Sequence, residues 1–299
     1  MKIAFIWMGF DGRYGKWRDG LWKAMQIIAE KHTVNFYDVN NLDAIAQFEP
    51  DIVLYWEAPC TMVGADAWFY KKVCALPYKK ALLFAGGELR AEWVIDFDLV
   101  FVESRINEED CERQGIPFRR AFGVNDDIFK PEQQPKVFTG MFQATCATWK
   151  RQELFAYVLG SEGVLCGRNQ EADPYPFIKA RELHTLVLPE LPMEAVASLI
   201  NASHFVLNTS AYWGGGQRTT LEAMACGVPP IVMSDSPKNC EFVEESGFGF
   251  ISVPDVATIK EVVANNISTI DGKKGIEYIK SKWTGKHYAQ AILDGISNL

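Results

Sequence analysis

The chain has 299 residues and a formal net charge of −8, and 48% of its residues are hydrophobic. This length and apolar content predict a folded protein that is large enough for two domains. The acidic balance argues against a general nucleic-acid binder, and no apolar run reaches the roughly 18 residues that a membrane-spanning helix needs.

The amino terminus and the cysteines indicate the compartment. Residues 1–7 look like a first strand and lack the small-residue cleavage site of a signal peptide. The seven cysteines are odd in number and include no C-x-x-C pair, so we expect reduced thiols. Together these observations favour a cytoplasmic protein.

The first half of the chain alternates short apolar runs with helical stretches. A helix through Leu21, Met25 and Ile28 follows the first strand. Strands are expected over residues 2–8, 33–39, 51–56, 80–85 and 99–103. Such alternation predicts a parallel sheet with helices on both faces.

Residues 123–131 and the following Glu-Gln-Gln-Pro are polar and rich in turn formers, which is typical of an interdomain linker. The alternation then restarts. Strands are expected over 137–143, 163–166, 185–188, 205–208, 230–233 and 250–253, and helices over 152–159, 193–201, 219–226, 256–265 and 287–296. The predicted fold is α/β with two doubly wound Rossmann-like domains. We place them at residues 1–130 and 131–285, and we expect a last helix within 286–299 to pack back on the first domain.

A glycine-rich loop running into a helix is the most informative motif. Three glycines at 214–216 precede Arg218, and a helix-forming run then extends to the breaker at 227–230. Backbone N–H groups at such a helix start point outward, and the helix dipole favours an anion there. We predict that this motif binds a nucleotide diphosphate, with Glu222 accepting from ribose hydroxyls. The predicted donor-binding residues of the motif are Gly215, Gly216, Gln217, Arg218, Thr219, Thr220 and Glu222.

Several segments resemble GT-B glycosyltransferases, and most of all the large retaining group often called family four. Residues 219–232 are similar to the donor-site helix of that group, 123–131 to its hinge, and 191–210 to the helix and strand before its glycine loop. Lys150 and Arg151 fall where the group carries a basic pair for the donor diphosphate. The resemblance implies two domains facing across a cleft. The second would bind a nucleotide-diphospho sugar and the first an acceptor hydroxyl, with retention of configuration.

Two positions depart from the pattern of that group. The group has a glutamate that holds the donor sugar eight residues before the position of Glu222, where this chain has Gly214. The group also has a histidine after a middle strand of its first domain, whereas residues 83–88 contain none. We assign stabilisation of the negative charge on the departing diphosphate to Lys150, Arg151 and Arg218. Because of the two departures, the residues that contact the donor sugar stay open.

Other candidates lie at the ends of predicted strands, where open α/β sheets place their ligands. The loop with Asp11, Gly12 and Arg13 is a candidate for the acceptor side, and a structural turn is an equally good interpretation. Glu88 would act as a catalytic base if burial raised its pKa; otherwise it is a surface glutamate. Arg168 is a candidate neighbour of the nucleobase.

We expect no metal and no cofactor besides the nucleotide-sugar co-substrate. Asp96-Phe97-Asp98 is a D-x-D, but it precedes a strand of a domain that otherwise fits the GT-B pattern, so we interpret it as two solvated aspartates. The four histidines are scattered, and no cysteine–histidine spacing suggests zinc.

The predicted activity is transfer of a sugar from a nucleotide-diphospho sugar to an acceptor hydroxyl. Three alternatives stay open. A nucleotide-sugar 2-epimerase would need more carboxylates and histidines. A phage-type glycosyltransferase acting on modified DNA would use a basic groove with Arg13, Lys16, Arg18 and Lys23. A nucleotide-sugar-binding protein without turnover would explain Gly214 and the missing histidine. The acceptor is unknown: a glycan, a lipid, a small molecule or modified DNA.

Overall fold

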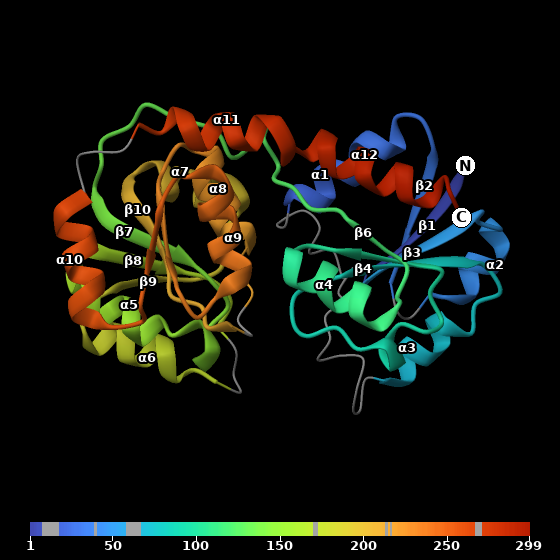
Figure 1. Cartoon of the computed structure of the whole chain (residues 1–299), viewed down its shortest axis with the longest axis horizontal. Coiled ribbons are helices and arrows are strands. Elements are labelled where there is room, and N and C mark those ends of the chain that lie inside the picture. Colours follow the sequence, from blue (N-terminus) through green and yellow to red (C-terminus); the bar gives the residue numbers. More distant parts are fainter. Residues whose placement is uncertain are drawn as a thin grey trace. The chain divides into compact units, whose positions relative to one another are not determined.

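The computed structural model describes residues 1–7, 18–38, 41–57, 67–169, 173–212, 215, 217–266 and 271–299. The chain forms two compact units. The first consists of Met1–Gly123 and Gly285–Leu299, and the second is Val124–Thr284. Within the described residues, each unit contains one six-stranded sheet with helices around it (Figure 1).

All neighbouring strands of the first sheet pair in parallel, in the order β2-β1-β3-β4-β5-β6. The strands are β1 Lys2–Trp7, β2 Thr33–Tyr37, β3 Ile52–Glu57, β4 Lys79–Phe84, β5 Leu99–Val102 and β6 Phe118–Arg120. The helices are α1 Gly20–Ala29, α2 Asp43–Phe48, α3 Ala67–Cys74, α4 Arg105–Gln114 and α12 Gly285–Ile296. The strand order reverses between β1 and β3, and the loops after these two strands fall in residues 8–17 and 58–66, outside the described residues.

The central strands are continuous apolar runs because helices cover both faces of the sheet. Ile6, Val53, Tyr55, Leu82 and Phe84 are buried together in one core cluster. The edge strand β6 was not predicted. Its three residues, Phe-Arg-Arg, contain two cations and alternate too briefly to indicate a strand.

The last helix, α12, belongs to the first unit and packs against α1. Close packing on β5 requires Gly295, because an added Cβ there would lie 2.6 Å from the ring of Phe101. Tyr288 meets Phe122 edge-on at 6.2 Å between ring centroids, and Arg119 pairs with Asp294 at 2.8 Å. The carboxyl-terminal helix thus completes the fold of the amino-terminal unit.

The second sheet is also parallel throughout, in the order β12-β11-β10-β7-β8-β9. Its strands are β7 Phe138–Gln143, β8 Gly163–Cys166, β9 Leu186–Leu188, β10 Ser203–Asn208, β11 Pro230–Met233 and β12 Phe250–Ser252. The helices are α5 Gln152–Leu159, α6 Tyr175–Glu182, α7 Met193–Asn201, α8 Gln217–Ala225, α9 Pro237–Ser246, α10 Val256–Asn266 and α11 Lys273–Lys282. Counted from β7, this is the 3-2-1-4-5-6 order of doubly wound sheets, and the predicted fold class is confirmed.

The segment expected as a linker is attached to the second unit. Asn201 at the end of α7 donates to the carbonyl of Lys130 at 3.0 Å and accepts from the backbone N–H of Glu132 at 3.0 Å. The backbone N–H of Val124 donates to the carbonyl of Trp283 at 2.8 Å, so the two points at which the chain passes between units lie side by side. In the described part of the chain, no helix has the length and apolar character needed to cross a membrane.

Candidate functional site

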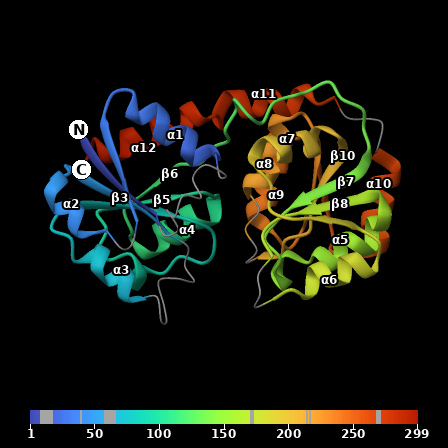
Figure 2. The same ribbon diagram turned by 180° about the vertical axis from the view of Figure 1, so that it is seen from behind.

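The second sheet has its topological switch point between β7 and β10, which pair directly (Figure 2). Ligands of open α/β sheets bind outside the carboxyl ends of the strands at such a point. The segments that emerge there are residues 144–151 after β7 and 209–217 after β10. These are the two segments in which the sequence places the basic pair and the glycine loop.

Lys150 lies beside the glycine loop. Gly215 has a φ of +57°, in the left-handed region, and an added Cβ there would lie 3.9 Å from Lys150 Nζ and 3.3 Å from Gln217 Oε1. The Lys150 ammonium and the start of α8 therefore come together around one glycine. Gly214 and Gly216 lie outside the described residues.

A second cation, Arg218 in the first turn of α8, is close to Lys150. Burial and the positive charge of Arg218 lower the pKa of Lys150 from 10.5 to about 8. Two like charges held together at a helix start, where the dipole also disfavours cations, are electrostatically unfavourable unless an anion joins them. A bound anion would therefore be stabilised by this arrangement.

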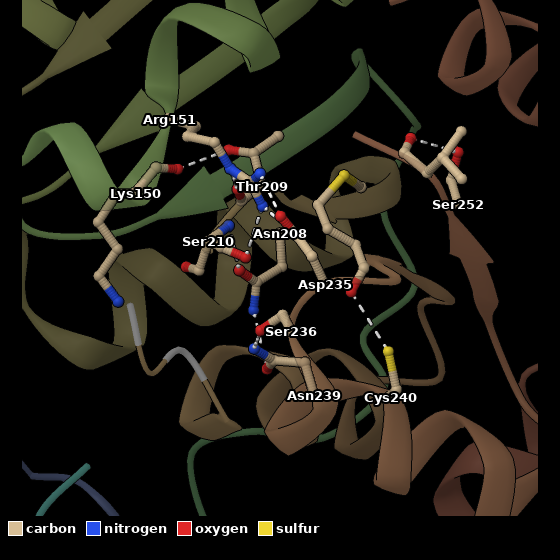
Figure 3. A network of polar contacts seen from close by, with 12 residues as sticks. Lys150, Arg151, Asn208, Thr209, Ser210, Asp235, Ser236, Asn239, Cys240 and Ser252 are labelled. Atoms are coloured by element: carbon tan, nitrogen blue, oxygen red, sulfur yellow. Dashed lines mark hydrogen bonds and ion pairs between the residues drawn. The ribbon is translucent and has the colours of Figure 1, made fainter. Parts of the chain in front are cut away.

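The adjacent cation, Arg151, has a different role from Lys150, and the two side chains diverge in Figure 3. Its guanidinium donates to both carboxylate oxygens of Asp235 at 2.8 Å and to the carbonyls of Thr209 and Ser210 at 2.7 and 3.0 Å. With its donors directed at protein acceptors, Arg151 is poorly placed to bind a phosphate. Of the predicted basic pair, the geometry favours Lys150 for the diphosphate.

The two threonines of the motif direct their hydroxyls at protein acceptors. The hydroxyl of Thr219 donates to the carbonyl of Gln143 at 3.1 Å. Thr220 is fully buried, and its hydroxyl donates to Asn239 Oδ1 at 2.8 Å and accepts from Asn208 Nδ2 at 3.1 Å. A hydroxyl has one proton to donate, so the side chains of Thr219 and Thr220 serve the fold.

Asn239 in the first turn of α9 holds the glycine loop in place. Its amide nitrogen donates to the carbonyl of Gly215 at 3.0 Å and to Ser236 Oγ at 2.8 Å. Its amide oxygen accepts from Asn208 (Figure 3) and from the Thr220 hydroxyl. Neither Asn208, at the end of β10, nor Asn239, in the first turn of α9, was predicted as a site residue, because asparagine is common at the ends of elements and in turns throughout proteins.

The remaining donor-side candidates differ in exposure. Glu222 is 1% exposed, and its charge, after burial, contributes to raising the pKa of Cys166 to about 12. The carboxylate of Glu222 therefore lies near the carboxyl end of β8. Gln217 is also buried, whereas Arg168 is exposed two residues beyond β8.

The candidates of the first unit are only partly described. Asp11, Gly12 and Arg13 lie outside the described residues. Glu88 follows β4 and is exposed, with its carboxylate 3.3 Å from Arg90 Nη2. The burial that would turn Glu88 into a base is absent. Asp98 of the D-x-D accepts from the backbone N–H of Lys80 at 2.8 Å, and the described residues contain no group of three metal-binding side chains.

Known proteins resemble this chain in sequence over its second unit and in fold over its whole length. Residues 134–274 match the family model of glycosyl transferases group 1. No curated protein matches the sequence of the chain.

Among solved structures, sucrose-phosphate synthase from Thermosynechococcus elongatus superposes with a TM-score of 0.75 at 13% identity, covering 100% of this chain and 98% of that one. HepE from Anabaena, in complex with UDP and glucose, gives a TM-score of 0.75 at 14% identity, covering both chains completely. AviGT4, a glycosyltransferase of avilamycin A biosynthesis, gives 0.72 at 14% identity, covering 100% and 98%.

Structural similarity at 13–14% sequence identity shows the fold of the chain. The match to the family model adds the class of enzyme. The chain is a glycosyltransferase with the GT-B fold, and the resemblance seen in the sequence is confirmed at this level.

Proposed function

We propose that this protein transfers a sugar from a nucleotide-diphospho sugar to an acceptor hydroxyl, with retention of configuration and without a metal ion. The second unit binds the donor at the switch point between β7 and β10. The anomeric carbon exchanges its bond to the diphosphate oxygen for one to the acceptor oxygen, and the proton of the acceptor hydroxyl passes to the departing nucleotide diphosphate. We propose the cytoplasm as its compartment, based on the cysteine content.

The observation that carries this proposal is the pairing of Lys150 and Arg218 beside Gly215. The departing nucleotide diphosphate gains negative charge in the transition state, and preorganised cations and backbone N–H groups stabilise that charge. Here the protein supplies two such cations itself, which is why we propose a metal-independent reaction. The solved complexes of HepE with UDP and with UDP-glucose support a nucleotide sugar as the ligand class.

A panel of UDP-, GDP-, ADP- and TDP-sugars tests the proposal by thermal unfolding. A ligand at 100 times its Kd stabilises the folded state by about 2.7 kcal/mol, which raises the midpoint by roughly 4 °C for a protein of this size. At least one member of the panel is expected to do so, and Arg218→Ala and Glu222→Ala are expected to abolish the shift. Arg181→Ala, which removes an exposed arginine on α6, is the matched control.

The results distinguish the alternatives. If no nucleotide shifts the midpoint, the donor site is wrong. Stabilisation without hydrolysis or transfer to any acceptor would instead indicate a binding protein. Transfer to duplex DNA with hydroxymethylated bases would identify the phage-type activity.

The pH dependence of donor binding follows from Lys150. Below about pH 8 its ammonium is charged and attracts the diphosphate; above that pH it loses its proton. We expect the affinity for the nucleotide diphosphate to fall about tenfold per pH unit above pH 8, because binding then requires uptake of a proton. Isothermal titration between pH 7 and 10 measures this. Lys150→Arg, which stays charged, should flatten the profile, and an equal slope in that variant would contradict the assignment.

A further inference from the structure

The turn that carries Lys150 is attached to two other loops at the same end of the sheet. The backbone N–H of Ala211 donates to the carbonyl of Trp149 at 2.9 Å, and the Thr209 hydroxyl donates to the carbonyl of Lys150 at 2.8 Å. These two bonds join the loop after β7 to the loop after β10, and Figure 3 shows the one between Thr209 and Lys150. The two bonds hold the backbone of Trp149 and Lys150 in position, and with it the start of the Lys150 side chain.

Arg151 extends this attachment to a third loop. Its guanidinium meets Asp235, which follows β11, in a two-point contact of 2.8 Å each, and it also donates to the carbonyls of Thr209 and Ser210. Two parallel hydrogen bonds from a planar guanidinium to a carboxylate fix the relative orientation of the two side chains as well as the distance between them. Loops from the three adjacent strands β7, β10 and β11 are thus held by one side chain.

The backbone of Arg151 adopts a conformation that suits glycine better than arginine. Its φ is +51°, in the left-handed region, where the short helical turn Thr148–Lys150 ends and α5 begins. A Cβ in that region is unfavourable. A glycine at this position would relieve the strain, but it would lack the guanidinium that contacts Asp235. The presence of arginine at a strained position therefore indicates that its side chain has a function there.

We propose that Arg151 and Asp235 are a positioning pair that aims Lys150 at the departing diphosphate, an inference that rests on the proposed function. Neither residue needs to touch the substrate. Asp235 also neutralises Arg151, so that the cation next to Lys150 in sequence does not add to the charge of Arg218. Burial and Arg218 already lower the pKa of Lys150.

The charge of the pair provides a measurable quantity, the pH at which Lys150 titrates, that would not change if Arg151 and Asp235 had a purely structural role. Among the residues that the structure describes, the charged groups around the turn, besides the pair itself, include Arg218 of α8, Glu153 of α5 and Asp173, which accepts from the backbone N–H of Thr148. Replacing Asp235 by Asn leaves Arg151 uncompensated beside Lys150. The titration of Lys150 should then move to lower pH, and the alkaline limb of the activity profile should move with it.

The experiment uses Asp235→Asn and Arg151→Gly in the full chain. Asp294→Asn is the matched control, because Asp294 is about as exposed as Asp235 and pairs with Arg119 at the same 2.8 Å, in the first unit. One readout is the NMR titration of 13Cε-labelled lysines, with the Lys150 signal assigned by Lys150→Met. The other is kcat and KM for release of nucleotide diphosphate from the sugar donor that the thermal panel selects.

We expect Asp235→Asn to lower the titration point of Lys150, and both variants to lower kcat by about 10- to 100-fold with little change in KM. Asp294→Asn should change neither quantity. Because glycine suits the backbone conformation at residue 151, the Arg151→Gly variant should fold. If that variant kept the kcat of the wild-type protein, the proposal would be overturned. A wild-type kcat or an unmoved Lys150 titration in Asp235→Asn would overturn it as well. If no donor turns over, the proposed function fails, and the NMR titration alone decides whether the pair controls Lys150.

Discussion

Replacing Lys150 by methionine is expected to lower kcat by about 10²- to 10³-fold, which is the usual effect of removing one preorganised charge from a transition state. The same substitution should stabilise the fold. At pH 7 the folded protein holds a partly buried cation near Arg218, and methionine fills similar space without that charge. Loss of activity with gain of stability is typical of a residue retained for function.

The stability gain should depend on pH in a defined direction. The folded-state pKa of Lys150, about 8, lies below its ordinary value of 10.5, so the protonated side chain destabilises the fold. The penalty is fully present below pH 8 and disappears as the pH rises through 10.5. The full shift corresponds to about 3 kcal/mol, and partial exposure reduces this to roughly 1–3 kcal/mol.

Urea unfolding at pH 7 and pH 10.5, together with turnover, checks both halves of this prediction. Lys280→Met, an exposed lysine on α11, is the matched control and should change neither stability nor turnover. A Lys150→Met protein with full turnover would remove Lys150 from the mechanism. Equal stabilisation at both pH values would show that the gain does not come from the charge.

Replacing Asn239 by alanine is expected to have the largest effect on stability. The substitution removes two donated and two accepted hydrogen bonds from a side chain that is 1% exposed, and it leaves the buried Thr220 and Asn208 without this partner. Such losses cost about 2–4 kcal/mol. The Gly215 carbonyl also loses its support, so we expect the affinity for the nucleotide diphosphate to fall about tenfold.

A second buried asparagine separates the two effects. Asn201 is 3% exposed and bonds the segment at Lys130 and Glu132, away from the glycine loop. Asn201→Ala should cost similar stability and leave nucleotide affinity unchanged. Calorimetric titration with UDP, GDP, ADP and TDP, beside urea unfolding, measures both. Equal losses of affinity in the two variants would show that Asn239 acts only through global stability.

Most strands of both sheets were predictable because they are short, largely apolar runs between turn formers. The failures have physical reasons. Strand β6 has only three residues, two of them arginines, so the alternation of apolar and polar residues that indicates a strand cannot be seen in the sequence. For α9, Pro237 suggests a breaker, but in the structure it occupies the first turn of the helix, where proline is tolerated.

The site was only partly predictable. Lys150 and Arg151 are neighbours with the same charge, so nothing in the sequence ranks them. Their difference appears when Asp235, 84 positions away, and the Thr209 and Ser210 carbonyls engage one of them. Glu88 was a candidate base on the condition that it is buried, and the structure places it in solvent beside Arg90.

By itself the sequence predicted the two-sheet architecture from apolar periodicity, and its resemblance to GT-B glycosyltransferases gave the class of enzyme. The anion-binding motif around Gly215 and Arg218, a glycine loop at a helix start, stays a prediction. The tertiary structure decided that Asp235 and two carbonyls engage Arg151, that the hydroxyls of Thr219 and Thr220 bond to protein acceptors, and that Asn239 supports the glycine loop. Those outcomes depend on the partners that distant loops bring to the carboxyl ends of β7, β10 and β11, and contacts between distant segments leave no periodic trace in a single chain.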